Sequence, residues 1–306
     1  MDMNSNGILL SGASGMLGSA LRRALRLRNT NLLQLVRREP AADNQLAWNP
    51  ADVPPLEDSS RLEGFAAAVH LSGASVAGRR WTPAYKEEIL SSRVNSTHAL
   101  SMLLAGLHMP PRALLVASAI GYYGDRGEEM LDETSASGVG VLPDMCRQWE
   151  AASRPAAEAG IRVVHLRFGV VLGPSEGALA QMLPIFRLGL GGKLGSGSQW
   201  MSWIGLEDTI AAILCALDTR ALTGPVNLTA PNPVTNAEFT HALAQQLKRP
   251  AFLPVPATAL RLAFGEMADE ALLSSARVFP SKLLGAGFSF TQPTVAQALA
   301  AALQKS

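Results

Sequence analysis

A glycine-rich turn near the start of the chain constrains its fold more than any other feature of the sequence. The apolar run at residues 7–10 leads into the stretch Ser11-Gly12-Ala13-Ser14-Gly15-Met16-Leu17-Gly18, in which two residues separate each glycine from the next. After the turn the apolar residues follow helical spacing, at Leu17, Leu21 and Leu25. The stretch therefore predicts a strand, a tight turn and a helix in close succession.

Glycine at these three places suits a site for the pyrophosphate of a dinucleotide. Such a site needs a turn with an unusual backbone angle, close approach of the backbone to the phosphates, and close packing of the helix on the strand. The phosphates would lie at the helix N-terminus, where unpaired N–H groups and the helix dipole favour negative charge. A glycine turn that binds nothing is the plain alternative. No Gly-Lys-Ser/Thr follows, which argues against a nucleoside-triphosphate loop.

Length and composition limit the classes of protein that the chain can belong to. Its 306 residues are enough for a large α/β domain and a smaller lobe, and 48% hydrophobic against 17% charged residues indicates a compact globular chain. The net charge of +1 argues against nucleic acid as a partner, because binding its phosphates needs a clear basic excess. No apolar run is long enough to span a membrane, Cys146 and Cys215 cannot build a disulfide framework, and no cleavable leader precedes the first strand. We therefore expect a cytoplasmic protein without a membrane partner, and we assign no metal ligands.

Strand and helix patterns alternate along much of the chain. Buried apolar runs are predicted as strands at residues 31–36, 66–74, 113–124, 161–172 and 225–229, and helices at about 144–160, 207–217, 235–247, 257–264 and 295–303. This alternation predicts an α/β fold, a doubly wound parallel sheet covered by helices on both faces. We place a dinucleotide-binding domain at residues 1–235, including a loop at 174–205 that faces the cleft, and a smaller C-terminal substrate lobe at 236–306. The glycine-dense part of that loop is interpreted as a lid or a linker, with Trp200 and Trp203 as candidate walls of the cleft.

The predicted strand at 31–36 ends in Arg37 and Arg38, followed by Glu39. In dinucleotide-binding folds this position faces the adenosine ribose, where an acid binds the 2′-hydroxyl or a basic residue binds a 2′-phosphate. A guanidinium matches phosphate geometry, so the two arginines favour NADP(H) over NAD(H). An ordinary basic surface turn is the alternative, and Glu39 counts mildly in its favour.

The apolar run that begins at residue 113 ends in a serine and two tyrosines, Ser118, Tyr122 and Tyr123. Because ligands bind at the carboxyl ends of parallel strands, these hydroxyl groups are our candidate catalytic residues. For Tyr123 a structural role is the alternative. His70 lies inside another strand, and Cys146 has no histidine base near it in the sequence, so both are interpreted as core residues.

Together these stretches resemble an extended short-chain dehydrogenase/reductase of the nucleotide-sugar epimerase/dehydratase superfamily. The motifs that carry the resemblance cover most of the chain in order: SGASGMLG, VHLSGA, Arg93–Asn95, VASAIGYYG and LRFGVVLGP. Further segments are similar to an epimerase-like subgroup, the SDR39U type, which has its own C-terminal domain: SAIGYYG, CRQWE, PIFRLGLGGKLGSGSQWMSWI with Asp208, and RVFPSKLLGAGFSF.

The resemblance implies a Rossmann-like sheet, NADP(H) binding, and an oxidoreductase or epimerase activity on a small molecule such as a nucleotide sugar or a carbonyl compound. A smaller lobe would hold that substrate. The residues that would bind the cofactor are Gly12, Ser14, Gly15, Met16, Leu17, Gly18, Arg37, Arg38, Leu71, Ser72, Gly73, Asn95, Ala117, Ser118, Arg167 and Phe168.

One departure from that superfamily concerns the proton donor. Its members place a Tyr-x-x-x-Lys pair on the helix after the fifth strand, where the tyrosine exchanges a proton with the substrate and the lysine lowers the tyrosine pKa. Here the matching positions are Cys146 and Glu150, and no other Tyr-x-x-x-Lys follows. Three interpretations stay open. Tyr122 or Tyr123 exchanges the proton while Ser118 orients the substrate, water or a substrate group supplies it, or the chain is a redox sensor or regulatory module without turnover.

Overall fold

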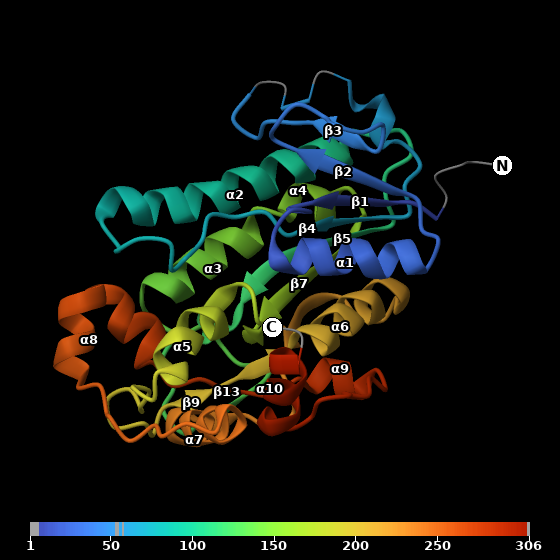
Figure 1. Cartoon of the computed structure of the whole chain (residues 1–306). Helices are drawn as coiled ribbons and strands as arrows, with labels where there is room; N and C mark the ends of the chain where they lie inside the picture. Colours follow the sequence, from blue (N-terminus) through green and yellow to red (C-terminus); the bar gives the residue numbers. More distant parts are fainter. Residues whose placement is uncertain (1–5, 53–54, 57, 305–306) are drawn as a thin grey trace.

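The computed structural model describes residues 6–52, 55–56 and 58–304. At its centre is a seven-stranded sheet in the order β11-β7-β5-β4-β1-β2-β3, with every neighbouring pair parallel (Figure 1). These strands are β1 (Ile8–Ser11), β2 (Leu32–Val36), β3 (Gln45–Ala47), β4 (Ala67–His70), β5 (Ala113–Ala119), β7 (Arg162–Phe168) and β11 (Gly224–Leu228). The strand order reverses at β1, and ligands of such sheets bind outside the carboxyl ends of the strands at this point.

Helices cover both faces of the sheet because its strands are apolar on both sides. Ile8 and Leu10 of β1 belong to one core, and Leu9 to the core on the opposite face. The first core includes helices α1 (Met16–Leu27) and α6 (Leu206–Asp218), and the second includes α2 (Pro83–Ala105), α3 (Val141–Ala151) and α4 (Arg154–Glu158). The predicted doubly wound sheet is therefore confirmed. Among the helices in the described ranges, none is both long and apolar enough to cross a membrane.

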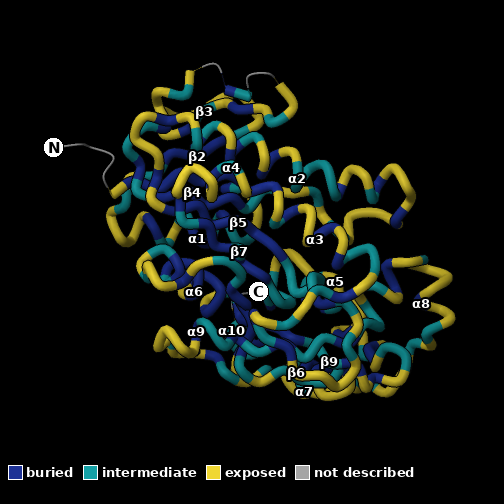
Figure 2. The backbone as a smooth tube through the Cα atoms, turned by 180° about the vertical axis from the view of Figure 1, so that it is seen from behind, coloured by how far each residue is buried: buried dark blue, intermediate teal, exposed yellow. Residues whose placement is uncertain are grey.

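A smaller lobe lies below the sheet in the view of Figure 1, and its core includes Trp203, Phe239 and Leu299. Its helices are α5 (Gly177–Arg187), α7 (Asn236–Leu247), α8 (Ala257–Phe264), α9 (Ser281–Gly285) and α10 (Val295–Gln304). Three strand pairs join them: β8 (Val170–Leu172) with β10 (Trp203–Gly205), β9 (Trp200–Met201) with β12 (Val234–Thr235), and β6 (Met130–Leu131) with β13 (Arg277–Val278). Short turns of 3₁₀ helix lie at η1 (Ser59–Leu62) and η2 (Ile120–Tyr123), and a π turn at η3 (Ala268–Leu272). Figure 2 shows that buried backbone continues from the sheet into this lobe.

The last part of the chain is interwoven with segments far earlier in the sequence. Strand β13 pairs with β6, and the Phe279 N–H donates to the Leu131 carbonyl at 2.7 Å. The buried carboxylate of Asp208 accepts the backbone N–H groups of Thr291 and Gln292, each at 2.9 Å. The lobe is thus built from both halves of the sequence. Our division of the chain at residue 235 stays a prediction.

Several segments differ from the sequence expectation, and the strand expected at 161–172, for example, is divided into β7 and β8, which belong to different sheets. The segment at 174–205, expected as a loop, contains α5, whose residues Leu179, Leu183 and Phe186 are buried. Pro184 lies inside this helix. Because a proline normally indicates that a helix ends or breaks, the sequence pattern did not predict α5. The helix expected at about 144–160 begins instead at Val141 and is divided into α3 and α4.

Helix α7 begins at Asn236, close to the start of the helix predicted at 235–247, and local hydrogen bonds explain this agreement. The Thr235 hydroxyl accepts the backbone N–H of Glu238 at 3.2 Å, and the Glu238 carboxylate accepts the backbone N–H of Thr235 at 2.7 Å. This reciprocal capping box satisfies two N–H groups that the first helical turn leaves unpaired.

Candidate functional site

Two glycines of the first turn are required by the packing of the turn itself. Gly12 has a φ of +78°, and a Cβ there would lie 2.7 Å from the carbonyl carbon of Leu71, which follows β4. A Cβ on Gly18 would lie 2.1 Å from the carbonyl oxygen of Gly12. The turn can therefore form and pack against β4 only if both positions lack a side chain.

Gly15, between them, is not required by packing. It has ordinary extended backbone angles, φ −75° and ψ 173°, and the nearest atom to a Cβ built there is the Gly12 carbonyl oxygen at 3.9 Å. The next residue, Met16, begins α1, and its N–H donates to a carboxylate oxygen of Glu176 at 3.0 Å. The space beside Gly15 and the backbone N–H groups at the start of α1 are what a phosphate site requires, and a bound phosphate would take the place of the Glu176 carboxylate at Met16.

A pocket of about 380 Å³ opens beside this turn, and we call it the glycine-turn pocket. Eight of the predicted cofactor residues line it: Gly12, Ser14, Gly15, Arg37, Arg38, Leu71, Ser72 and Gly73. An adjoining hollow of about 470 Å³ shares Arg37, Ser72 and Gly73 with it and is also lined by the predicted residue Asn95. The structure thus brings together the turn, the end of β2 and the end of β4. The two arginines at the end of β2 are both exposed.

The same pocket includes residues that the sequence reasoning missed, namely Arg22, Gln34, Gln45 and Trp48. Arg22 extends from α1, and its guanidinium donates to the side-chain carbonyl of Gln34 at 3.3 Å. One signal was available in the sequence, because a glutamine inside an apolar strand, at position 34, is a polar residue that needs a partner. Trp48 gave no such signal, since it follows a three-residue strand that the sequence pattern did not predict.

The remaining predicted cofactor residues lie elsewhere. Met16 lines the larger cleft described below, whereas Leu17 and Gly18 belong to the first turns of α1. Ala117 is buried, and Phe168 packs against the cores on both faces of the sheet. Ser118 and Arg167 belong to a buried polar network. A cofactor role for these residues stays a prediction.

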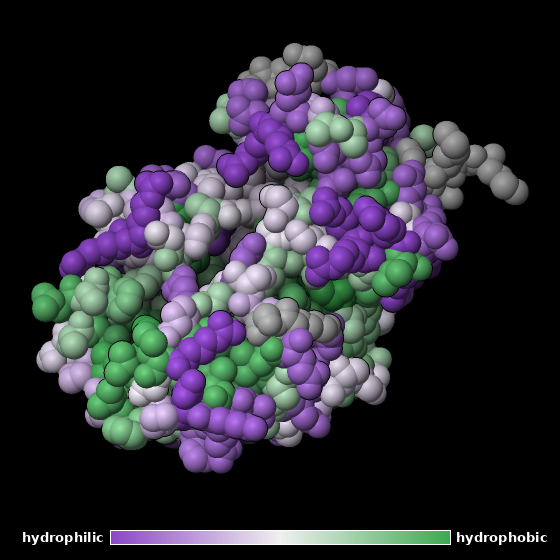
Figure 3. Space-filling model, viewed as in Figure 1, coloured by the Kyte–Doolittle hydropathy of each residue, from purple (hydrophilic) through white to green (hydrophobic). Residues whose placement is uncertain are grey.

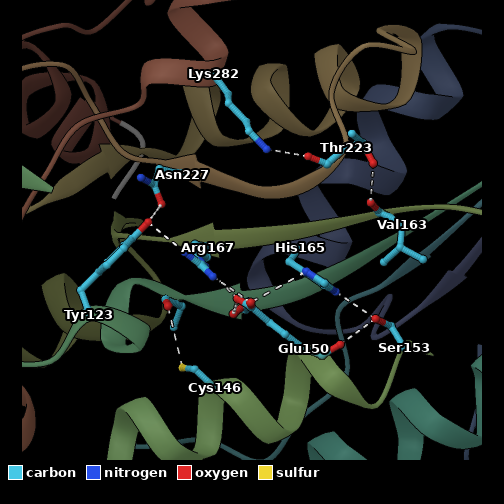
Figure 4. Close-up of polar contacts among 12 residues, drawn as sticks. Tyr123, Cys146, Glu150, Ser153, Val163, His165, Arg167, Thr223, Asn227 and Lys282 are labelled. Atoms are coloured by element: carbon cyan, nitrogen blue, oxygen red, sulfur yellow. Dashed lines mark hydrogen bonds and ion pairs between the residues drawn. The ribbon is translucent and has the colours of Figure 1, made fainter. Parts of the chain in front are cut away.

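That network is centred on Glu150 of α3, which points toward the carboxyl ends of β5 and β7 (Figure 4). Arg167 donates to both carboxylate oxygens, from Nε and Nη2, at 2.8 Å each, and the Ser118 hydroxyl donates to Oε1 at 2.7 Å. Burial disfavours the charge of Glu150, but the hydrogen bonds and the charge of Arg167 outweigh it and keep the pKa of Glu150 below its ordinary value. Glu150 is therefore an ionised partner of Arg167 inside the fold.

The three candidate catalytic residues gather around the same arginine. Tyr123 is fully buried, and its hydroxyl donates to Asn227 Oδ1 at 2.8 Å and accepts from Arg167 Nη1 at 3.0 Å. Burial raises the pKa of Tyr123 to about 12. Tyr122 is half-buried, and its ring centroid lies 3.4 Å from the Arg167 guanidinium carbon. The hydroxyls of Ser118 and Tyr123 are thus already bonded within the protein.

Two residues interpreted as core, His70 and Cys146, are indeed buried. The Cys146 thiol lies 3.8 Å from the carbonyl oxygen of Ala119, and burial, with the negative charge of Glu150 as the next cause, raises the pKa of Cys146 to about 12. Burial lowers the pKa of His70 to about 4, so this histidine is neutral at pH 7. A thiol that stays protonated is a poor nucleophile, which agrees with a packing role for Cys146.

A cleft of about 540 Å³ lies between the carboxyl ends of the strands and the smaller lobe. Its lining runs from Met16, at the start of α1, past Ile120 and Gly121 after β5, to Ala276 before β13. The three candidate catalytic residues are close in sequence to Ile120 and Gly121, which line this cleft. They do not line it themselves: Ser118, Tyr122 and Tyr123.

The expected walls and lid of the cleft need correction. Trp200 lines the cleft, but the expectation for Trp203 is wrong, because its side chain is fully buried in the core of the lobe. The glycines before it serve close packing, since a Cβ on Gly191 would lie 2.6 Å from the Phe186 ring and one on Gly192 would lie 1.7 Å from the Leu253 carbonyl oxygen. The glycine-dense segment is therefore packed closely against the rest of the lobe, which does not fit the lid that we considered for it.

A parallel sheet that reverses its order at a glycine turn, with paired arginines at the end of the next strand, defines a dinucleotide-binding protein of the Rossmann class. Residues 8–228 match the NAD dependent epimerase/dehydratase family, and residues 255–302 match a domain of unknown function, DUF1731. The chain therefore belongs to the NAD dependent epimerase/dehydratase family.

Its relatives share both parts. Epimerase family protein Mb2239 of Mycobacterium bovis is 46% identical over 292 residues, which cover 95% of this chain and 96% of that protein. The crystal structure of human epimerase family protein SDR39U1 (isoform 2) with NADPH has a TM-score of 0.90 and 31% identity, covering 98% of this chain and 99% of that one. A nucleoside-diphosphate sugar epimerase from Corynebacterium glutamicum has a TM-score of 0.80 and 34% identity, covering 98% of this chain and 58% of that one. The predicted resemblance to the SDR39U type is thus confirmed.

Proposed function

We propose that this chain binds NADP(H) in the glycine-turn pocket and transfers hydride between that cofactor and a small molecule in the cleft, as an oxidoreductase or epimerase. The observation that carries the proposal is the position of Met16. Its backbone N–H lies at the start of α1, where the phosphates would bind, and the residue also lines the cleft. Gly15, the residue before it, lines the glycine-turn pocket, so the two sites adjoin, as hydride transfer requires.

The residues of the turn fit a dinucleotide on two grounds. The space beside Gly15 is open to the pyrophosphate, and the backbone N–H of Met16, at the start of α1, is a donor that a phosphate oxygen would accept from in place of the Glu176 carboxylate. Arg37 and Arg38 would bind the 2′-phosphate that distinguishes NADP(H) from NAD(H). The human relative solved with NADPH supports this choice of cofactor.

The bound cofactor would supply or accept the hydride, and the chain would position the substrate and exchange the proton. We assign the proton exchange to Tyr122, because the hydroxyls of Ser118 and Tyr123 already bond within the network around Arg167. Tyr122 follows Gly121, which lines the cleft. Water or a substrate group is the alternative proton source.

The first experiment is a titration with NADPH and NADH, followed by turnover with aldehydes, ketones, quinones and nucleotide sugars. Tyr122→Phe should lower turnover by about 10²–10⁴-fold, the usual contribution of a positioned acid or base, while NADPH affinity stays unchanged. The matched control is Tyr123→Phe, which removes a buried hydroxyl from the network and should lower stability more than turnover. Failure of both cofactors to bind would overturn the proposal, and unchanged turnover in Tyr122→Phe would assign the proton to water or the substrate.

A redox sensor or regulatory module that binds NADP(H) without turnover is the second candidate function. The observation in its favour is that Cys146 and Glu150 occupy the positions of the usual tyrosine and lysine, and that Glu150 is held in an ion pair with Arg167. Tight NADPH binding without turnover of any compound on the panel would favour this function. The cytoplasmic location stays a prediction.

A further inference from the structure

We propose that the cleft takes an uncharged, largely apolar carbonyl compound in preference to a nucleotide sugar. The inference rests on the proposed function and specifies its substrate class. It starts from the side chains that line the cleft, most of which are apolar: Met16, Val76, Ala77, Ile120, Leu142, Val170, Val171, Ala178, Met182, Leu194, Trp200, Met201, Phe264, Met267, Ala271, Leu272 and Ala276. Figure 3 shows apolar surface, in green, gathering at the lower left of the molecule, where Figure 1 places α5 and α8.

The charge of the lining argues against a diphosphate. Among the described residues that line the cleft there is no lysine, arginine or histidine, and the charged residue there is Glu270. A nucleoside diphosphate carries about two negative charges, which proteins bind with arginine, lysine or a free helix N-terminus. Arg277 follows the lining residue Ala276 in the sequence but does not line the cleft itself. The carbon of its guanidinium group lies over the ring of Trp200, 4.2 Å from the ring centroid.

The N-terminus of α3, at the cleft, already faces a carboxylate. Glu270 accepts the backbone N–H groups of Val141 and Leu142, the first two residues of α3, at 3.2 and 3.1 Å. A second anion there would meet like charge, so this helix end cannot replace the missing basic residues.

The kind of apolar side chain indicates what shape the ligand has. Four of the lining residues are methionines, Met16, Met182, Met201 and Met267. Methionine is unbranched and polarizable, so a wall of this kind adapts to irregular or flat apolar groups. Trp200 and Phe264 add aromatic faces, which favour contact with rings or alkyl chains over a hydrated sugar.

The reaction that fits such a ligand is the reduction of a ketone or aldehyde. One hydride from NADPH adds to the carbonyl carbon, the C=O π bond breaks, and one proton adds to the oxygen, which gives an alcohol and NADP⁺. The reverse reaction oxidises the alcohol. No further oxidant or reductant is required.

The test measures ligand binding to the NADPH complex before it measures turnover. The apolar probes are 2-decanone and benzil, the polar probes are UDP and UDP-glucose, and binding is followed by calorimetry. We expect both apolar probes to bind at least 100-fold more tightly than either nucleotide. Tighter binding of UDP or UDP-glucose, or no binding of the apolar probes up to their solubility limit, would overturn the inference. Failure of NADPH itself to bind would instead overturn the proposed function, and the probes can still be titrated against the chain alone.

Charge variants make this test more specific, because an added cation should change the affinity for the two substrate classes in opposite directions. Met182→Lys places a cation on the cleft wall, and Gln181→Lys does so at an exposed lining position of α5 that folding does not depend on. For an apolar ligand we expect at least 10-fold weaker binding in both variants with unchanged NADPH affinity, whereas a diphosphate ligand would bind more tightly. Gln246→Lys, exposed on α7 and outside the cleft lining, controls for the added net charge. Apolar probes that bind both cleft variants as tightly as they bind the unmodified chain would contradict the inference.

Discussion

Replacing Gly15 with valine should abolish cofactor binding and leave the fold intact, which separates function from stability at one position. The backbone at Gly15 is extended, as valine prefers, and a Cβ there meets no atom closer than 3.9 Å. The substitution should therefore change the free energy of unfolding by less than about 1 kcal/mol, because valine also restricts the unfolded chain.

The loss of affinity follows from what the side chain would displace. The isopropyl group would enter the space assigned to the pyrophosphate, which would lose its charge-assisted bonds to the backbone N–H groups of the turn. Each such bond contributes about 1.5–3 kcal/mol, so losing two weakens binding on the order of 10²–10⁴-fold. NADPH fluorescence titration measures the affinity, and thermal unfolding measures the stability.

The matched control is Gly18→Ala, in which the added Cβ would lie 2.1 Å from the Gly12 carbonyl oxygen. This variant should lose stability, by on the order of 1–3 kcal/mol or more, because a backbone atom has to move. The reasoning would be refuted if Gly15→Val bound NADPH as the unmodified protein does, or if it unfolded as readily as Gly18→Ala.

Three further predictions concern charge. Arg37→Ala combined with Arg38→Ala should remove most of the preference for NADPH over NADH, since each contact to the extra phosphate contributes about 1–3 kcal/mol; equal affinity for both cofactors in the unmodified protein would contradict this. Burial lowers the pKa of His70 from 6.5 to about 4, so the unfolded chain takes up this proton first, and stability should fall between about pH 6.5 and pH 4 by on the order of 3 kcal/mol. Urea unfolding at a series of pH values checks this, and a slope that persists unchanged in His70→Gln would rule His70 out as its source. Glu150→Gln should lose about 3–5 kcal/mol in urea unfolding because it leaves the Arg167 charge buried without its partner, and the double variant with Arg167→Met should recover part of that loss; a single variant as stable as the unmodified protein would count against the ion pair.

The sequence was a sufficient guide where a local pattern determines the structure. The glycine spacing predicted the first turn, and the helical pattern that starts at residue 235 predicted the start of α7. Both depend on residues within a few positions of one another, so no knowledge of the remaining fold was needed.

The sequence was insufficient where residues far apart meet. The bond between the Tyr123 hydroxyl and Asn227 joins positions 104 residues apart, and nothing at either position indicates the other. The same holds for Trp203, whose neighbours in the core come from α7 and α10, so burial could not be distinguished from a place on the cleft wall. Helix α5 was missed for a different reason, because Pro184 is locally unfavourable in a helix and only its packing in the lobe core compensates for this.

The pairing of β6 with β13 also bears on how the chain acquires its shape during synthesis. Residues 130–131 leave the ribosome long before 277–278, so the strand at Met130 and Leu131 has to wait for its partner while almost 150 further residues are made. The strands of the parallel sheet all precede residue 229, whereas Leu283, a member of one of its cores, comes later. Ala276, which completes the lining of the cleft, arrives with the late strand, so a nascent chain can form its dinucleotide turn before it has a finished place for a substrate.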